Sequence, residues 1–199
     1  IMGSNAGGIC GQNTGGFLLS PNNTGNGTVY ILDSSYNGNI GIDSGGIVGN
    51  NSGGTLTIQR CYSTGGYIDT NAGGICGSYL GKNGGTIKIY DCSSSNYLRG
   101  TAGGICGPFV GVHDGNLDAK IDINITNCYY GNTISTINSG GICGPYAGIS
   151  SNEIKVKGNV ILAKYFVYIE VYDFSVSEDE ELQVGSAEVK QKTTLGLQV

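Results

Sequence analysis

The stretch Ala72-Gly73-Gly74-Ile75-Cys76-Gly77 decides the fold, because close copies of it recur along the chain. The other four copies occupy residues 6–11, 44–49, 102–107 and 139–144, and Val48 replaces the cysteine in one of them. The first glycines of the five copies lie 38, 28, 30 and 37 residues apart. Spacings of this size are typical of solenoids, in which each repeat packs against its neighbours.

A second set of segments lies between the glycine motifs and alternates apolar with polar residues. These segments are residues 28–31, 55–58, 86–89 and 121–125. Alternation with a period of two is typical of a half-buried strand. Stacked copies would bury their apolar sides together, with glycines turning the corners through positive φ and close backbone approach. The sequence therefore predicts an all-β protein, a right-handed parallel β-solenoid of about five coils.

The last fifty residues differ from the rest of the chain. Residues 1–149 are the predicted Gly-rich solenoid, whereas residues 150–199 contain few glycines and many charged side chains. Residues 164–176 alternate with apolar or aromatic side chains on both faces, and such a strand needs cover on two sides. We expect residues 150–199 to form a β-rich cap or oligomerisation segment. The expected assembly residues are Phe166, Tyr168, Tyr172 and Phe174.

Composition and charge exclude some functions. The formal net charge of −5 argues against a nucleic-acid partner, which needs a basic surface. Apolar runs are too short to span a bilayer, since Lys164, Glu170 and Asp173 interrupt the most apolar stretch. Residues 1–16 show no signal peptide, having neither a basic start nor an apolar centre. The sequence predicts no membrane span and no nucleic-acid partner.

The seven cysteines fall into two columns when the repeats are aligned. The first column contains Cys10, Val48, Cys76, Cys106 and Cys143. The second contains Ser34, Cys61, Cys92 and Cys128. No two cysteines lie within three positions of each other, so the close pairs of zinc sites are missing, and a position that accepts Val is a packing position. We expect free thiols stacked as structural ladders, with no metal and no cofactor; disulfides between adjacent coils are the alternative.

A row of polar residues precedes the second column: Asp33, Arg60, Asp91 and Asn127. Carboxylates and cations gathered on one face could serve a polysaccharide hydrolase or lyase. A neutralising ladder of alternating charge is the competing interpretation, and it is the one we adopt. The only histidine, His113, is expected in an exposed loop, and residues 77–83 are a near miss to a phosphate-binding loop, with Asn83 in place of Ser or Thr.

Two further surface patterns concern ligands. Thr28, Thr55 and Thr86 share one position in the aligned repeats. A ladder of threonines is typical of ice-binding solenoids, so ice binding is an alternative function, although few threonines form the array. Four Asn-x-Ser/Thr sequons would permit surface glycosylation in a secreted protein. These sequons begin at Asn22, Asn26, Asn50 and Asn124.

Residues 45–65, which run from Gly45-Gly46-Ile47-Val48-Gly49 to Cys61-Tyr62-Ser63-Thr64-Gly65, resemble the GLUG-type repeat of bacterial surface adhesins and of some secreted peptidase stalks. The Gly-Gly-Ile-Cys-Gly form is also similar to repeats in giant DNA virus proteins. This resemblance implies a display or attachment role and brings no catalytic residues. The expected function is a non-enzymatic structural protein at a virion or cell surface, either a virion or fibre component or an adhesin-like stalk. It would associate with itself or with a larger assembly, and a glycan partner stays open.

Overall fold

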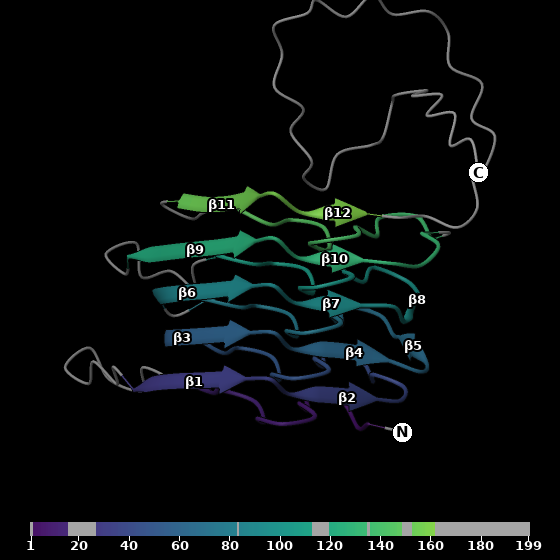
Figure 1. Cartoon of the computed structure of the whole chain (residues 1–199), viewed down its shortest axis with the longest axis horizontal. Helices are drawn as coiled ribbons and strands as arrows, with labels where there is room; N and C mark the ends of the chain where they lie inside the picture. Colours follow the sequence, from purple (N-terminus) through teal and green to yellow (C-terminus); the bar gives the residue numbers. More distant parts are fainter. Residues whose placement is uncertain are drawn as a thin grey trace, which may run out of the picture.

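The computed structural model describes residues 2–15, 27–82, 84–112, 120–134, 136–148 and 153–161. These residues contain strands and no helix, and the chain winds as a parallel β-solenoid of about four coils (Figure 1). The sequence predicts about five coils. The difference arises because five stacked glycine segments enclose four complete circuits of the chain.

The first side of the solenoid is a five-stranded parallel sheet in the order β1-β3-β6-β9-β11. Its strands are β1 (Thr28–Leu32), β3 (Gly54–Gln59), β6 (Gly85–Tyr90), β9 (Ile121–Thr126) and β11 (Glu153–Lys157). Alternate residues of each strand point inward, and the register places them one above another. One inner column runs through Leu56, Ile87 and Ile123, and a second runs through Ile58, Ile89 and Ile125. All six are fully buried, so the core forms by repetition.

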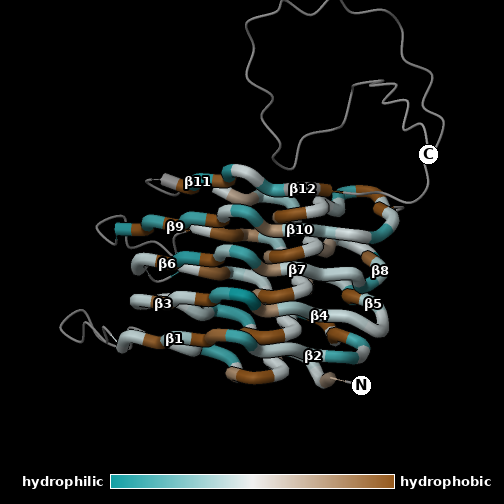
Figure 2. Tube along the Cα trace, viewed as in Figure 1, coloured by the Kyte–Doolittle hydropathy of each residue, from teal (hydrophilic) through white to brown (hydrophobic). Residues whose placement is uncertain are grey.

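The second side is another five-stranded parallel sheet, in the order β12-β10-β7-β4-β2. Its strands are β2 (Ser35–Asn37), β4 (Tyr62–Thr64), β7 (Ser93–Ser94), β10 (Tyr129–Tyr130) and β12 (Val160–Ile161). A two-stranded sheet of β5 (Tyr67–Ile68) and β8 (Tyr97–Leu98) lies at the next corner. Figure 2 shows apolar and polar segments recurring at the same places in successive coils.

The third side consists of the glycine motifs. Single parallel bridges connect Gly7 to Gly45, Gly73, Gly103 and Gly140 in turn. The isoleucine that follows the glycine pair lies in the core in the last four motifs, where Ile47, Ile75 and Ile105 are fully buried and Ile142 is 4% exposed. The repeated hexapeptide therefore supplies one wall of the solenoid, across from the inner face of the first sheet.

The motif glycines are needed for space and not for unusual φ. None of the five first glycines has a positive φ, contrary to the expectation that they turn corners through positive φ. A Cβ on Gly103 would instead overlap the carbonyl oxygen of Cys106 and lie 2.5 Å from the backbone nitrogen of Gly144. Among the described residues, positive φ occurs instead at eleven glycines outside the motifs and at thirteen other residues, of which nine are Asn or Asp.

Strands β11 and β12 lie beyond residue 149 and continue the two sheets, pairing with β9 and β10. The stacked coils thus reach Ile161, within the segment that the sequence assigns to the C-terminal cap. The expected assembly residues Phe166, Tyr168, Tyr172 and Phe174 lie outside the described residues.

Candidate functional site

The row of Asp33, Arg60, Asp91 and Asn127 lies where each coil bends from the first sheet into the second. All four residues have a positive φ, between 50° and 55°. Gly158 has the same place in the last coil, with a φ of 65°. This conformation suits Gly, Asn and Asp and is costly for Arg. The row, which we call the arch row, therefore meets a backbone requirement of every coil.

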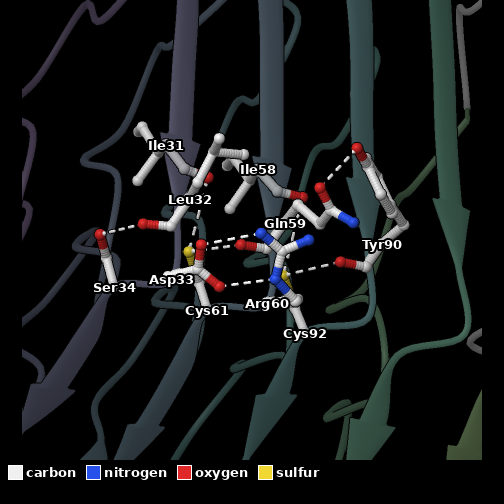
Figure 3. Close-up of polar contacts among 10 residues, drawn as sticks. All are labelled: Ile31, Leu32, Asp33, Ser34, Ile58, Gln59, Arg60, Cys61, Tyr90 and Cys92. Atoms are coloured by element: carbon white, nitrogen blue, oxygen red, sulfur yellow. Dashed lines mark hydrogen bonds and ion pairs between the residues drawn. The ribbon is translucent and has the colours of Figure 1, made fainter.

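Within the arch row, Arg60 forms a two-point contact with Asp33 (Figure 3). Its Nε donates to Oδ1 at 2.5 Å and its second terminal nitrogen donates to Oδ2 at 2.7 Å. The hydrogen bond from Arg60 lowers the pKa of the Asp33 carboxyl. Since the side chains are 49% and 62% exposed, this pair adds little to stability. The sequence predicts a row of alternating charge, and between the first two coils Asp33 and Arg60 form such an oppositely charged pair.

An open depression of about 280 Å³ lies beside the arch row on the outer face of β6 and β9. Asp91 is the one carboxylate among the described residues that line it. Its other lining residues are Lys88, Ile89, Tyr90, Asn124, Thr126 and Asn127. The phenol of Tyr90 donates to Oε1 of Gln59 at 2.9 Å. Glycoside hydrolysis by acid and base uses a pair of carboxylates. The depression does not provide that pair.

The second cysteine column is a column of hydrogen-bond donors. The thiols of Cys61, Cys92 and Cys128 each donate to the carbonyl two residues earlier, at 3.3 to 3.5 Å. The hydroxyl of Ser34 does the same to Leu32, at 2.9 Å. Each thiol also lies 3.6 to 3.8 Å from the carbonyl of an inner isoleucine in the preceding coil (Figure 3). This donor column accepts Ser or Cys because a short donor is what the position requires.

Asn159 extends the donor column into the last coil, and the sequence analysis missed it. Its amide nitrogen donates to the carbonyl of Ile125 at 3.0 Å, and its carbonyl accepts from the backbone of Cys128 at 2.7 Å. The signal was its place directly after Gly158, which corresponds to Cys128 after Asn127. Asn159 was not aligned with the donor column because a longer amide side chain replaces the cysteine there.

The first cysteine column is a packing column. Parallel bridges join Cys10, Val48, Cys76, Cys106 and Cys143 in that order. Apart from half-buried Cys10, its members are buried. The two columns contact the same core cluster, and all seven cysteines are free thiols in the structure.

Thiol reactivity is expected to be very low in the folded protein. Burial raises the pKa of Cys76, and the hydrogen bond with Cys128 together with burial raises that of Cys92 to about 12. The reactive species is the thiolate, so at pH 8 we expect only the half-buried Cys10 to react quickly with Ellman's reagent. Cys10→Ser should remove that fast phase, and denaturation without reductant should release all remaining thiols. Fewer than seven thiols in the denatured wild-type protein would mean that disulfides form.

A column of aromatic residues, also missed from sequence, lies three residues after the motif cysteines. Tyr79, Phe109 and Tyr146 have φ values of 56°, 61° and 64°. The rings stack at centroid distances of 4.8 and 5.1 Å, within 11° of parallel. Asn13 and Asn51 have the same place in the first two coils. Stacking offsets part of the cost of a positive φ at bulky residues.

The remaining predicted ligand patterns lie apart from one another. Thr28, Thr55 and Thr86 do align, but the next residue in their column is Asp122, so the threonine array ends there. Of the sequons, Asn124 lies on the outer face of β9, half-buried. Asn50 is buried, with its amide donating to Asn5 at 2.7 Å, so it is closed to modification in the folded chain. Asn22, Asn26 and His113 lie outside the described residues.

Residues 77–82 of the near miss to a phosphate-binding loop are part of a coil corner, and Asn83 lies outside the described residues. Ser78 is buried, and its hydroxyl donates to Asp43 at 3.3 Å. The Lys82 ammonium lies over the ring of Tyr79, 5.1 Å from its centroid. Within the described ranges no three His, Cys, Asp or Glu side chains gather as a metal site would require. The same residues include no helix long and apolar enough to cross a membrane.

Comparisons with known proteins add no relative: no family model, curated protein or solved structure matches this chain.

Proposed function

We propose that this chain is a non-enzymatic structural or surface-display protein, a rigid solenoid that assembles by joining the end of one copy to the end of another. The settings that fit are a virion or fibre component and an adhesin-like stalk. The support is physical: stacked coils share main-chain hydrogen bonds from β1 to β11, and a column of this kind resists bending.

The observation that carries this proposal is the exposed apolar surface of the first described coil. Ile9 is 49% exposed, whereas the same position in the other four glycine motifs is 0 to 4% exposed. Among the described strands, β1 likewise pairs only with β3. An exposed core position, beside a parallel edge that has no partner in the part of the chain that the structure describes, favours addition of another strand.

The occupant that we propose for this end is the C-terminal segment of a second copy, residues 150–199. All strands of the solenoid are parallel, so β11 of one copy runs in the direction that the edge of β1 of another would accept. Such a contact joins two different surfaces and extends to filaments unless it closes into a ring.

Light scattering should test this assembly on four chains. The full chain should be oligomeric, whereas Ile9→Lys and a chain ending at Ser150 should be monomeric, because the first puts a charge on the exposed apolar position and the second removes β11 and the residues after it. Ile137→Lys is the matched control, since Ile137 is 87% exposed in a loop and should leave the oligomer intact. A monomeric full chain would contradict the proposal.

The non-enzymatic part has its own test. The arch row contains one ion pair within the described ranges, Asp33 with Arg60, and these two groups already bond each other. We therefore expect no turnover on a panel of neutral and acidic polysaccharides. Turnover that Asp91→Asn abolishes would overturn the proposal in favour of a polysaccharide hydrolase or lyase.

A further inference from the structure

The outer face of the second sheet alternates tyrosine with serine from coil to coil. Strand pairing puts Ser35 beside Tyr62, Tyr62 beside Ser93, and Ser93 beside Tyr129. We call the surface formed by these four residues the tyrosine face. Tyr62 is 49% exposed and Tyr129 is 37% exposed. Being two strand spacings apart, their backbones are separated by about 9.5 Å along the solenoid.

The serine between the two rings keeps them unstacked. At Tyr79, Phe109 and Tyr146, which occupy consecutive coils, each ring covers the next. The Tyr67 ring is likewise covered, by the guanidinium of Arg99 at 3.6 Å. The small Ser93 side chain instead leaves a gap between Tyr62 and Tyr129. The tyrosine face thus presents two separate aromatic side chains, two coils apart.

Gly131 helps to hold the Tyr129 ring against the sheet. A Cβ at Gly131 would lie 2.6 to 2.9 Å from ring atoms of Tyr129, so the ring lies over the backbone of its own strand. The glycine does not have a positive φ, so its role here is to leave space. A ring laid along a sheet in this way directs one face outward, which is how aromatic side chains receive the flat apolar side of a sugar.

The residues that follow the rings along the chain are polar and uncharged. Thr64, Ser95 and Gly131, two positions further along the same strands, carry hydroxyl groups or no side chain. On the other side the arch row offers Asp91, whose carboxylate can accept hydrogen bonds from hydroxyl groups and would repel acidic ligands. Arg60 is already paired with Asp33. The charge pattern therefore matches a neutral ligand rich in hydroxyl groups.

We propose that the tyrosine face binds a neutral, extended polysaccharide lying along the solenoid axis, with sugar rings on Tyr62 and Tyr129. One pyranose unit of an extended β-linked chain is about as long as one strand spacing, so alternate sugars fall on alternate coils. The sugar between them lies over Ser93 and its neighbouring hydroxyl groups. This site does not depend on assembly, because each copy carries it whole.

Affinity electrophoresis and calorimetry with the full chain test the proposal. The probes are hydroxyethylcellulose and cellohexaose as neutral β-linked glycans, a neutral mannan, and polygalacturonate as the acidic comparator. We expect binding to a neutral glycan and weaker binding to polygalacturonate. Tyr62→Ala and Tyr129→Ala should each weaken binding by about tenfold, the loss expected for one aromatic contact.

The matched control is Tyr30→Ala, since Tyr30 is 67% exposed on the outer face of β1, in the other sheet. It should change the affinity by less than about twofold, and circular dichroism should show all variants folded. Ser93→Tyr should fold, stack its ring between the other two and abolish binding, and Gly131→Ala should weaken binding by displacing the Tyr129 ring.

Three results would overturn the proposal: no binding to any neutral probe, equal loss with Tyr30→Ala, or undiminished binding by Ser93→Tyr. These outcomes are separate from the assembly test, since a monomeric chain that binds glycan would reject only the assembly.

Discussion

Gly103→Ala should destabilise the fold by at least about 3 kcal/mol, and it should leave much of the chain unfolded at 37 °C. One added methyl would overlap the carbonyl oxygen of Cys106 and lie 2.5 Å from the nitrogen of Gly144. Both contacts are with backbone held by hydrogen bonds between coils, so neither can move away alone. Urea denaturation followed by circular dichroism measures the change in the free energy of unfolding.

The matched control is Gly11→Ala, at the last glycine of the first motif. No heavy atom lies within 4 Å of a Cβ built there, and its φ is not positive. This variant should unfold within about 0.5 kcal/mol of the wild type. If both variants unfolded at the same urea concentration, close approach would not be the reason for the glycine motif.

Asn96→Ala should destabilise the protein by about 3 kcal/mol, because a fully buried amide connects three coils. Its nitrogen donates to the carbonyl of Gly38 at 3.1 Å. Its oxygen accepts from the hydroxyl groups of Ser63 and Ser94, at 2.9 and 3.4 Å. Removing it leaves these buried groups without their partner and opens a cavity.

The neighbouring Ser95→Ala serves as control, since the Ser95 side chain is exposed and points to the other face of the chain. Thermal unfolding should separate the two variants by several degrees or more. An Asn96→Ala protein as stable as Ser95→Ala would show that the amide is dispensable and that the core alone aligns the coils.

The sequence predicts which residues form the arch row but not their backbone conformation. Alignment of the repeats placed Asp33, Arg60, Asp91 and Asn127 in one row, and the structure has them at the same bend of successive coils. Their shared positive φ could not be read from the sequence, since Arg rarely adopts it. The bend is set by the strands on either side of it, and these are positioned by contacts between coils.

One property of the tyrosine face, the alignment of its residues, could be predicted from the sequence. Tyr62, Ser93 and Tyr129 each follow a residue of the donor column, so their alignment was predictable. What alignment could not provide was exposure, or the way the Tyr129 ring lies over Gly131. Side-chain direction depends on how the second sheet packs against the core.

The sequence by itself determined the repeat, the strands, the parallel stacking and the two cysteine columns, because periodicity in an all-β chain leaves few ways to bury its apolar residues. Only the tertiary structure decided the number of coils and the reason for the motif glycines. It also decided which ring faces are open and that strands after residue 149 join the sheets. Those features depend on distances between residues far apart in the chain, and a local pattern does not contain such distances.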